Sequence, residues 1–239
     1  MLDLSMSVPL WSRVLWVGGF ALLVAAAAYF MGCFNGAVIV SKYILHDDVR
    51  KHGSGNAGLT NFFRTFGGPL TFAVILTDVL KAIAAVAFGI LIASRFFLPL
   101  AGNNIFEVFP EDPVLMLAWA KYWAGLWCLL AHMFPCMFGF RGGKGILSGG
   151  TIAIMLDWRI ALVVWGGFIV LVLLTRYISL GSCWAGASFP FVTWFVYQDA
   201  VLLVIAIFLG GLILWKHRGN IQRLLDGTES KFSLHKKKA

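Results

Sequence analysis

Seven apolar segments divide this 239-residue sequence, and a more polar stretch separates each from the next. They cover residues 14–40, 70–93, 114–138, 146–156, 160–175, 183–197 and 200–215. A helix that crosses the hydrocarbon core of a bilayer needs about 20 mostly apolar residues. The sequence therefore predicts an all-α fold class, a polytopic bundle of transmembrane helices that forms one domain over residues 1–239.

The number of spans depends on how the shorter segments are counted. Every segment crosses in a seven-span bundle, whereas residues 146–175 and 183–215 each form one long span in a five-span alternative. The five-span alternative would place Asp157, Arg159 and Asp199 inside the membrane, where a charge is costly. We therefore favour seven spans, with the short segments arranged as tight antiparallel pairs.

The composition agrees with a membrane protein, because 60% of the residues are hydrophobic and only 13% are charged. Soluble domains contain about 25% charged residues, so we expect no sizeable soluble domain. The net charge of +8 would suit a nucleic-acid partner, but the basic residues are scattered over short loops, as topology signals are. The first apolar segment is too long for the core of a signal peptide and is interpreted as a span.

The distribution of Lys and Arg predicts the orientation of the bundle. Loops on one side carry the basic tail and Lys42, Arg50, Lys51, Arg64, Arg141, Lys144 and Arg176. Loops on the other side carry Arg13, Arg95 and Arg159 and most of the acidic residues, namely Asp3, Glu107, Glu111, Asp112, Asp157 and Asp199. Cytoplasmic loops are enriched in Lys and Arg. We therefore expect the N-terminus outside and the C-terminus in the cytoplasm.

A glycine-rich polar stretch at residues 53–64 is the first candidate for ligand binding. Glycine lets backbone N–H groups surround an anion, and Arg offers two parallel donors to a phosphate. The candidate residues are Gly53, Ser54, Gly55, Asn56, Thr60, Asn61 and Arg64. Glycines alone would also fit an ordinary flexible loop, but the dense set of polar side chains favours a phosphate site.

A second glycine-rich stretch follows the third apolar segment and contains Gly142, Gly143, Lys144 and Gly145. Phe138 stands where the first glycine of a P-loop would be, and Gly145 follows Lys144 where a P-loop has Ser or Thr. A nucleoside triphosphatase is therefore not predicted. A lysine just before a helix N-terminus is nevertheless suited to an anion. The alternative is a basic loop that only fixes the orientation in the membrane.

Two further polar groups lie at the ends of the last apolar segments. Ser182 is a candidate ligand for a substrate, although a cap for the following helix is the simpler interpretation when it is taken alone. His217 and Asn220 are three residues apart and share one helix face. A histidine and an amide in a basic pocket suit phosphate binding or proton transfer.

Polar residues inside the apolar segments are interpreted as structural. Asp78 and Lys81 are one helical turn apart, which predicts a local ion pair. His132 lies between Cys128 and Cys136 at helical spacing, but a fourth metal ligand is missing, so packing with one hydrogen bond is favoured over metal binding. The four cysteines are expected to be free, and no metal or cofactor is predicted.

Taken together, these motifs resemble those of the bacterial acyl-phosphate:glycerol-3-phosphate acyltransferases, in the same order and over nearly the whole chain. Residues 53–64 resemble the family's Ser-Gly-Asn-x-Gly-x-Thr-Asn-x-x-Arg motif. Residues 132–145 resemble its His-x-Phe-Pro and Gly-Gly-Lys-Gly block. Residues 175–182, 217–221 and 227–229 resemble its third block.

The resemblance implies that a fatty acyl group moves from acyl phosphate to the 1-hydroxyl of glycerol 3-phosphate, giving lysophosphatidic acid and phosphate. It implies catalytic or positioning roles for Ser54, Arg64, Lys144, His217 and Asn220. Together with Ser182, these residues would bind glycerol 3-phosphate or position its hydroxyl, and the backbone N–H groups around Gly53–Asn56 and Gly142–Gly145 would hold the acyl-phosphate head group. The proton acceptor would be either the substrate's phosphate or His217. The expected setting is the bacterial cytoplasmic (inner) membrane, with membrane lipid around the bundle and an enzyme that makes acyl phosphate as a partner.

The sequence departs from the family pattern at a few positions. Ala57 stands where a proline is usual, Ala131 replaces a glycine, and Gly219 replaces a larger residue. No departure removes a hydroxyl, amide or charge from the motifs, so they affect local geometry more than chemistry.

Other classes of protein explain the sequence less well. Acyl-CoA-dependent acyltransferases use His-x-x-x-x-Asp, and no histidine here is followed by Asp five residues later. A transporter of a phosphorylated solute would fit the short paired segments, but no inverted repeat is visible. A structural anchoring subunit would leave the polar motifs unexplained.

Overall fold

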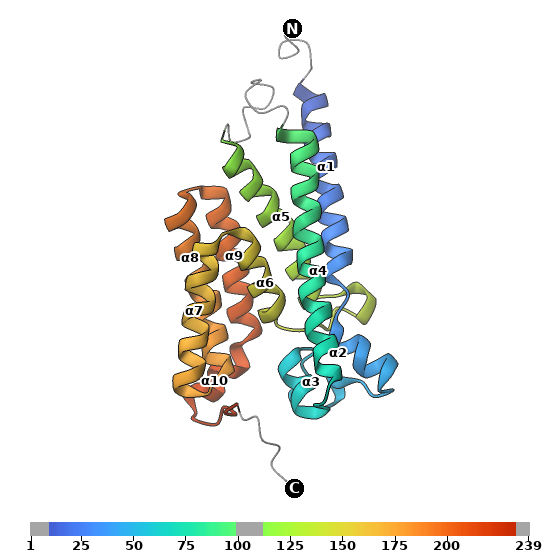
Figure 1. The fold of residues 1–239 in the computed structure, drawn as a ribbon, viewed down its shortest axis with the longest axis vertical. Coiled ribbons are helices and arrows are strands. Elements are labelled where there is room, and N and C mark those ends of the chain that lie inside the picture. The colour runs from blue at the N-terminus through green and yellow to red at the C-terminus, as the bar shows by residue number, and fades with distance from the viewer. Residues whose placement is uncertain (1–9, 99–111, 233–239) are drawn as a thin grey trace.

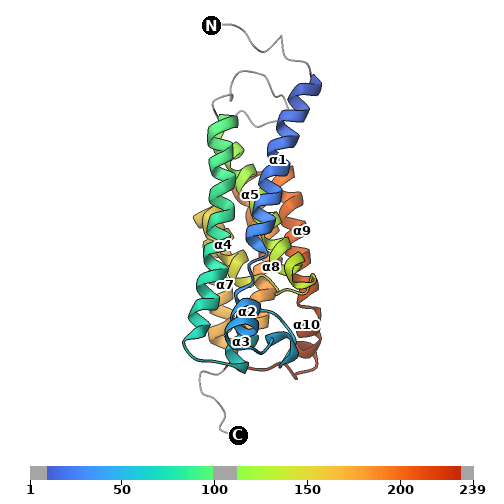
Figure 2. The ribbon, with the colours of Figure 1, turned by 90° about the vertical axis from the view of Figure 1, so that its right-hand side faces the viewer.

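The computed structural model describes residues 10–98 and 112–232, and within them every regular element is a helix (Figures 1 and 2). The α-helices are α1 (Leu10–Gly32), α2 (Gly36–Ile39), α3 (Leu59–Thr65), α4 (Leu70–Ile92), α5 (Pro113–Met133), α6 (Ile146–Leu156), α7 (Trp158–Thr175), α8 (Ile178–Tyr197), α9 (Ala200–Lys216) and α10 (Arg218–Leu225). Short π-helical turns span Val40–Ile44 and Ala93–Phe97, and 3₁₀ turns span Val49–Lys51 and Cys136–Phe138. The expected all-α fold class is confirmed. Asp3, Glu107, Glu111 and the last seven residues of the basic tail lie outside the described residues.

Each of the seven apolar segments contains one of the longer helices, and α6 coincides with the expected segment 146–156. The first segment is interrupted after Gly32, and Asn35 caps α2 by accepting a hydrogen bond from the N–H of Val38 (3.1 Å). Helix α8 begins at Ile178, five residues earlier than expected. Its first turns carry Ser179 and Ser182, which are buried, so their polarity marks an inward-facing helix surface and not a turn.

The longer helices alternate in direction along the chain (Figures 1 and 2). Within the described residues, four helical stretches are long and apolar enough to cross a membrane. A fifth is added if α9 and α10, which are bent by 58° relative to each other, count as one broken span. Helix α6 has only 11 residues. The total of seven spans and the orientation of the termini therefore remain predictions.

Two groups of helices form the bundle. Helices α1, α4 and α5 pack together on one side, α7, α8 and α9 pack on the other, and α6 lies between them (Figure 1). Small residues allow close approach: a Cβ added to Gly89 would lie 2.8 Å from the Cβ of Ala124, and one added to Gly210 would lie 2.4 Å from the carbonyl oxygen of Gly186. Such contacts are typical of packing between membrane helices. The four cysteines are free, as expected.

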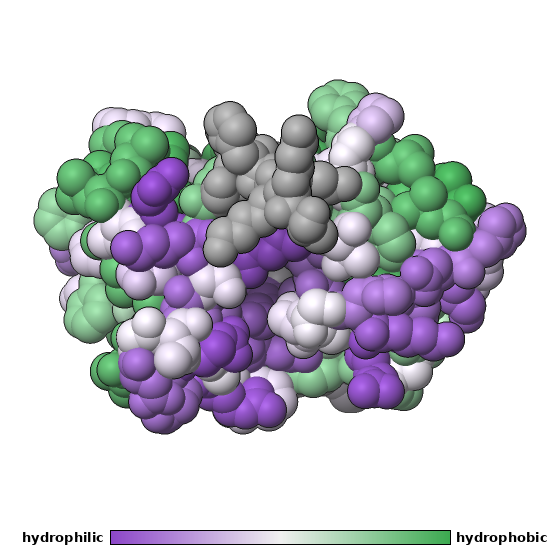
Figure 3. Space-filling model, turned by 90° about the horizontal axis from the view of Figure 1, so that it is seen from below, coloured by the Kyte–Doolittle hydropathy of each residue, from purple (hydrophilic) through white to green (hydrophobic). Residues whose placement is uncertain are grey.

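One end of the bundle carries the polar motifs. Helices α3 and α10 lie at this end in both ribbon views, where α3 packs against α4 and α10 packs against α8 (Figures 1 and 2). Viewed from that end, hydrophilic residues extend across the middle of the surface and hydrophobic residues flank them (Figure 3). This arrangement brings together segments that are far apart in sequence, such as Arg64 and Ser230, which are separated by 166 residues, and it defines the candidate site.

Candidate active site

A cavity of about 320 Å³ opens at this end of the bundle. Its lining includes ten of the residues selected from the sequence, namely Ser54, Asn56, Thr60, Asn61, Arg64, Lys144, Gly145, Ser182, His217 and Asn220. Gly53, Gly55, Gly142 and Gly143 belong to the same two loops but do not line the cavity. The fold therefore places all the side chains predicted to be catalytic around one space.

The first glycine-rich loop is organised by the buried side chain of Asn61. Its amide nitrogen donates to the carbonyl oxygens of Val49, His52 and Asn56 at 3.0–3.1 Å. Its side-chain oxygen accepts from the N–H of Ser54 (3.1 Å). These bonds occupy the amide group, so we expect Asn61 to act on a substrate by shaping the loop around Ser54.

The second loop packs directly against the first. A Cβ added to Gly143 would lie 2.7 Å from the carbonyl oxygen of Ala57 and 2.3 Å from Nε2 of His132. Gly145 has a φ angle of 79° and precedes the first residue of α6. Glycine is therefore required here both for close approach and for a left-handed backbone conformation, and the loop holds Lys144 beside the cavity.

Lys144 belongs to a network of polar contacts among residues that line the cavity. Its ammonium group donates to the side-chain oxygen of Asn220. The amide nitrogen of Asn220 donates to Oε1 of Glu229 (2.8 Å), and Nε of Arg223 donates to Oε2 of Glu229 (2.7 Å). This network places the cations of Lys144 and Arg223 and the carboxylate of Glu229 around a space that suits an anionic ligand.

The charged groups of this network affect one another's pKa values. Burial, followed by the positive charge of Arg223, lowers the pKa of Lys144 to about 8. Burial opposes ionisation of Glu229, but hydrogen bonds from Asn220 and Arg223 outweigh it and lower the pKa of Glu229. At neutral pH Lys144 is therefore mostly charged and Glu229 is ionised.

His217 lies at the junction between α9 and α10. Its Nδ1 is 2.8 Å from the carbonyl oxygen of Ile213. A carbonyl oxygen only accepts, so Nδ1 carries the proton and Nε2 keeps a lone pair. Burial lowers the pKa of His217 to about 4, which keeps the ring neutral at physiological pH. Nε2 of His217 therefore has a free lone pair, but the lowered pKa makes the ring a weak base.

The segment after α10 folds back across the cavity. The guanidinium group of Arg64 donates to the carbonyl oxygen of Ser230 (3.4 Å). The N–H of Phe232 donates to the carbonyl oxygen of Arg176 (2.7 Å), and the ring of Phe232 lies 6.4 Å from that of Phe63. Residues 229–232 thus connect α3 to the turn before α8, and they place Glu229 and Ser230 in the cavity lining.

The two serines at the start of α8 also face the cavity. Tyr177 occupies the N-cap position of α8, so the interpretation of Ser182 as a helix cap is wrong. The hydroxyl of Ser182 donates to the carbonyl oxygen of Ile178 (2.9 Å). Ser179 is one turn earlier on the same helix face and was not selected from the sequence.

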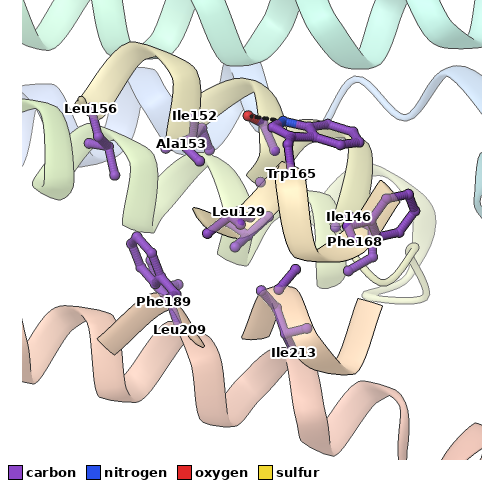
Figure 4. A pocket seen from close by; sticks show the side chains of 15 residues that line it. Leu129, Ile146, Ile152, Ala153, Leu156, Trp165, Phe168, Phe189, Leu209 and Ile213 are labelled. Atoms are coloured by element: carbon purple, nitrogen blue, oxygen red, sulfur yellow. Dashed lines mark hydrogen bonds between the residues drawn. The ribbon is translucent and has the colours of Figure 1, made fainter. Parts of the chain in front are cut away.

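An apolar pocket adjoins the polar cavity, and the two share the residues Gly145, Ile146, Trp165 and Phe168. Figure 4 shows its lining side chains, which come from α5, α6, α7, α8 and α9. Trp165 stands at the shared boundary and donates from Nε1 to the carbonyl oxygen of Gly150 (3.0 Å). The site therefore combines a charged chamber with a hydrophobic one, which suits an amphipathic substrate.

Several lining residues were missed or given only a structural role in the sequence. Arg223, Glu229 and Ser230 lie beyond the last apolar segment, where basic and polar residues are expected for any membrane protein. Asp78 and His132 line the inner part of the cavity although they lie on membrane helices. In the described part of the chain, no group of three or more His, Cys, Asp or Glu side chains is placed to hold a metal ion.

The chain was compared with known families and proteins. The profile of the family described as glycerol-3-phosphate acyltransferase matches residues 22–227. Curated glycerol-3-phosphate acyltransferases are similar over most of their length. The protein from Mesorhizobium japonicum is 36% identical over 212 residues, covering 88% of this chain and 95% of the relative. The protein from Clostridioides difficile is 35% identical over 218 residues, covering 90% and 97%.

Solved structures lead to the same family. Two crystal structures of PlsY, an integral membrane glycerol 3-phosphate acyltransferase, are 29% identical to this chain and cover 90% of it, with 96% of their own chains matched. The TM-score is 0.73 for the glycerol 3-phosphate form and 0.70 for the lysophosphatidic acid form. With its motifs arranged around one cavity, the chain belongs to the glycerol-3-phosphate acyltransferase family.

Proposed function

We propose that this acyltransferase uses acyl phosphate as its donor and forms lysophosphatidic acid and inorganic phosphate from glycerol 3-phosphate. The observation that carries the proposal is the continuity of the polar cavity with the apolar pocket through Gly145, Ile146, Trp165 and Phe168. An acyl phosphate has an apolar chain joined directly to an anionic head group. The part of its chain next to the carbonyl group would enter the apolar pocket, whose volume is about 40 Å³, while its head group lies among the cations of the cavity.

Glycerol 3-phosphate would bind in the outer part of the cavity. Arg64 and Lys144 supply positive charge, and the hydroxyl of Ser54 supplies a hydrogen bond. The hydroxyl of Ser182 would donate to the phosphate only by turning away from the carbonyl oxygen of Ile178. Hydrogen bonds between cations and phosphate are about twice as strong as those between neutral groups. Glu229 would repel a phosphate placed directly against it, so the phosphate is expected on the Arg64 and Lys144 side of Asn220.

The reaction then needs alignment more than a covalent intermediate. The 1-hydroxyl oxygen attacks the acyl carbonyl carbon, the bond from that carbon to the phosphate oxygen breaks, and inorganic phosphate leaves. The hydroxyl proton passes either to Nε2 of His217, whose lone pair is available, or to the departing phosphate. Because the donor is already activated, positioning and charge neutralisation supply most of the acceleration.

The cavity is proposed to face the cytoplasm from the bacterial inner membrane. The basic loops of this end support that orientation, since cytoplasmic loops are enriched in Lys and Arg. In sealed right-side-out vesicles, glycerol 3-phosphate added outside should give no product until the membrane is permeabilised. Equal turnover before and after permeabilisation would place the cavity on the outer face. A cytoplasmic cavity would receive acyl phosphate from an enzyme that phosphorylates or transfers acyl groups.

A comparison of donors tests the proposed chemistry. Purified protein in detergent is given labelled glycerol 3-phosphate with palmitoyl phosphate, palmitoyl-CoA or palmitic acid, each at the same concentration. We expect labelled lysophosphatidic acid only with palmitoyl phosphate. Product from palmitoyl-CoA at an equal or higher rate would refute the donor assignment while leaving the acyltransferase family intact.

A further inference from the structure

Three ionisable side chains form a buried cluster where α4 meets α5. Asp78, Lys81 and His132 are 1%, 5% and 3% exposed. Nζ of Lys81 lies 2.8 Å from Oδ1 of Asp78, which confirms the predicted ion pair, and 2.7 Å from Nδ1 of His132. Charges in an apolar bundle are costly and usually functional. The structure therefore joins His132 to the ion pair instead of leaving it as an isolated packing residue.

The cluster fixes the protonation of the His132 ring. An ammonium group only donates, so Nδ1 of His132 accepts from Lys81 and the neutral ring carries its proton on Nε2. Lys81 also donates to the carbonyl oxygen of Phe34 (3.0 Å), which the break after α1 leaves free. The ammonium group of Lys81 thus makes two hydrogen bonds, to Nδ1 of His132 and to this carbonyl, and an ion pair with Asp78.

The other ring nitrogen of His132 lies against the second glycine-rich loop, which borders the active site. A Cβ added to Gly143 would lie 2.3 Å from Nε2, so this nitrogen lies against the loop that carries Lys144. His132 lines the polar cavity. Within the described residues, no hydrogen bond from Nε2 to a protein acceptor is found. The N–H of Nε2 is therefore a fixed donor available to a ligand.

His132 lies at the boundary between the polar cavity and the apolar pocket. Leu129, one helical turn earlier on α5, lines the apolar pocket, whereas His132 lines the polar cavity. In an acyl phosphate the carbonyl group joins the apolar chain to the phosphate. With the chain among the residues around Leu129 and the acyl-phosphate head group against the loop at Gly142 and Gly143, the carbonyl group would lie beside His132.

We infer that Nε2–H of His132 donates a hydrogen bond to the acyl carbonyl oxygen, and that Asp78 and Lys81 are positioning residues that hold the ring in this tautomer. The inference rests on the proposed acyl-phosphate donor. Attack by the hydroxyl moves negative charge onto the carbonyl oxygen, so a donor that is already oriented there stabilises the transition state more than the bound substrate.

Steady-state kinetics test the role of His132. Loss of one such donor lowers kcat by about 100-fold in other acyl-transfer sites, so we expect a fall of that order in His132→Ala with the KM for glycerol 3-phosphate unchanged within about twofold. The matched control is Tyr122→Phe. Tyr122 lies on α5, as His132 does, but outside the cavity, and the change removes its buried hydrogen bond to Thr193 (2.8 Å). It should keep kcat within about threefold.

The tautomer gives a readout that does not depend on activity. Solid-state nitrogen NMR of histidine-labelled protein in bilayers should show His132 with Nε2 protonated and Nδ1 unprotonated, the signal being assigned by its loss in His132→Gln. Lys81→Met should remove the tautomer preference and lower kcat. A ring protonated at Nδ1 in the wild type would overturn the inference even if the alanine variant failed to fold.

The outcomes separate this inference from the proposed function. An active wild type with a fully active His132→Ala variant overturns only the role of His132. A wild type that is inactive with every acyl phosphate overturns both proposals.

Discussion

Lys144 is a cation of the cavity whose charge changes within the pH range of an enzyme assay. Burial and the nearby Arg223 lower the pKa of Lys144 to about 8, whereas arginine stays charged throughout. The phosphate of the acceptor is a dianion above about pH 6. Increasing pH above neutrality should therefore weaken binding of the acceptor by removing the charge of Lys144.

The size of the effect follows from the pKa. With a pKa of about 8, about nine tenths of the lysine is charged at pH 7 and about one tenth at pH 9. If the charged form is required, kcat/KM for glycerol 3-phosphate should fall about tenfold as the pH increases by about two units, from 7 to 9. The profile of kcat/KM reports the free enzyme, so the pKa of the empty site is the relevant one.

The assay measures initial rates of lysophosphatidic acid formation from pH 6.5 to 9.5, with blanks that correct for hydrolysis of acyl phosphate. The matched variant is Lys144→Arg, whose charge does not titrate in this range, so its profile should lose the fall near pH 8. Lys121→Met is a control, since Lys121 bonds to the carbonyl oxygen of Leu156 and does not line the cavity. A fall with an unchanged midpoint in Lys144→Arg would refute the assignment to Lys144.

Three further predictions test other parts of the site. Arg64→Ala should lower kcat/KM at least tenfold, because the arginine is asked to supply more than about 1.4 kcal/mol; activity within twofold of the wild type, in folded and membrane-inserted protein, would contradict its role. Asn61→Ala should lower activity and also thermal stability by about 1–3 kcal/mol, since it leaves several carbonyl oxygens and one N–H of the first loop without a partner; a normal melting temperature by fluorescence would contradict this. Ala153→Phe should shift the preference toward shorter acyl phosphates, because Ala153 lines the apolar pocket; an unchanged chain-length profile would show that the acyl chain lies elsewhere.

Local features of the fold could be predicted from the sequence because they depend on neighbouring residues. The apolar run 146–156 predicted α6 with correct ends, and the spacing of Asp78 and Lys81 predicted their ion pair. The start of α8 was predicted too late because Ser179 and Ser182 resemble a polar turn until their burial is known.

Contacts between distant segments could not be predicted in this way. The side chain of His132 meets Lys81 across 51 residues, and Arg64 meets the carbonyl oxygen of Ser230 across 166 residues. Neither pairing has a sequence signal, since it depends on how α3, α4, α5 and the segment after α10 pack. The motifs selected the side chains of the site, but only the packing of the bundle shows that Glu229 and Arg223 complete it.

The measurement that tests the central claim most directly is phosphate release by the purified protein from palmitoyl phosphate and glycerol 3-phosphate, with each substrate omitted in turn. Phosphate release that needs both substrates, equals the lysophosphatidic acid formed and is lost in Lys144→Ala is the predicted result. Well-folded protein that releases no phosphate with any chain length, or that releases it equally without glycerol 3-phosphate, would contradict the claim that the two chambers hold both substrates for acyl transfer.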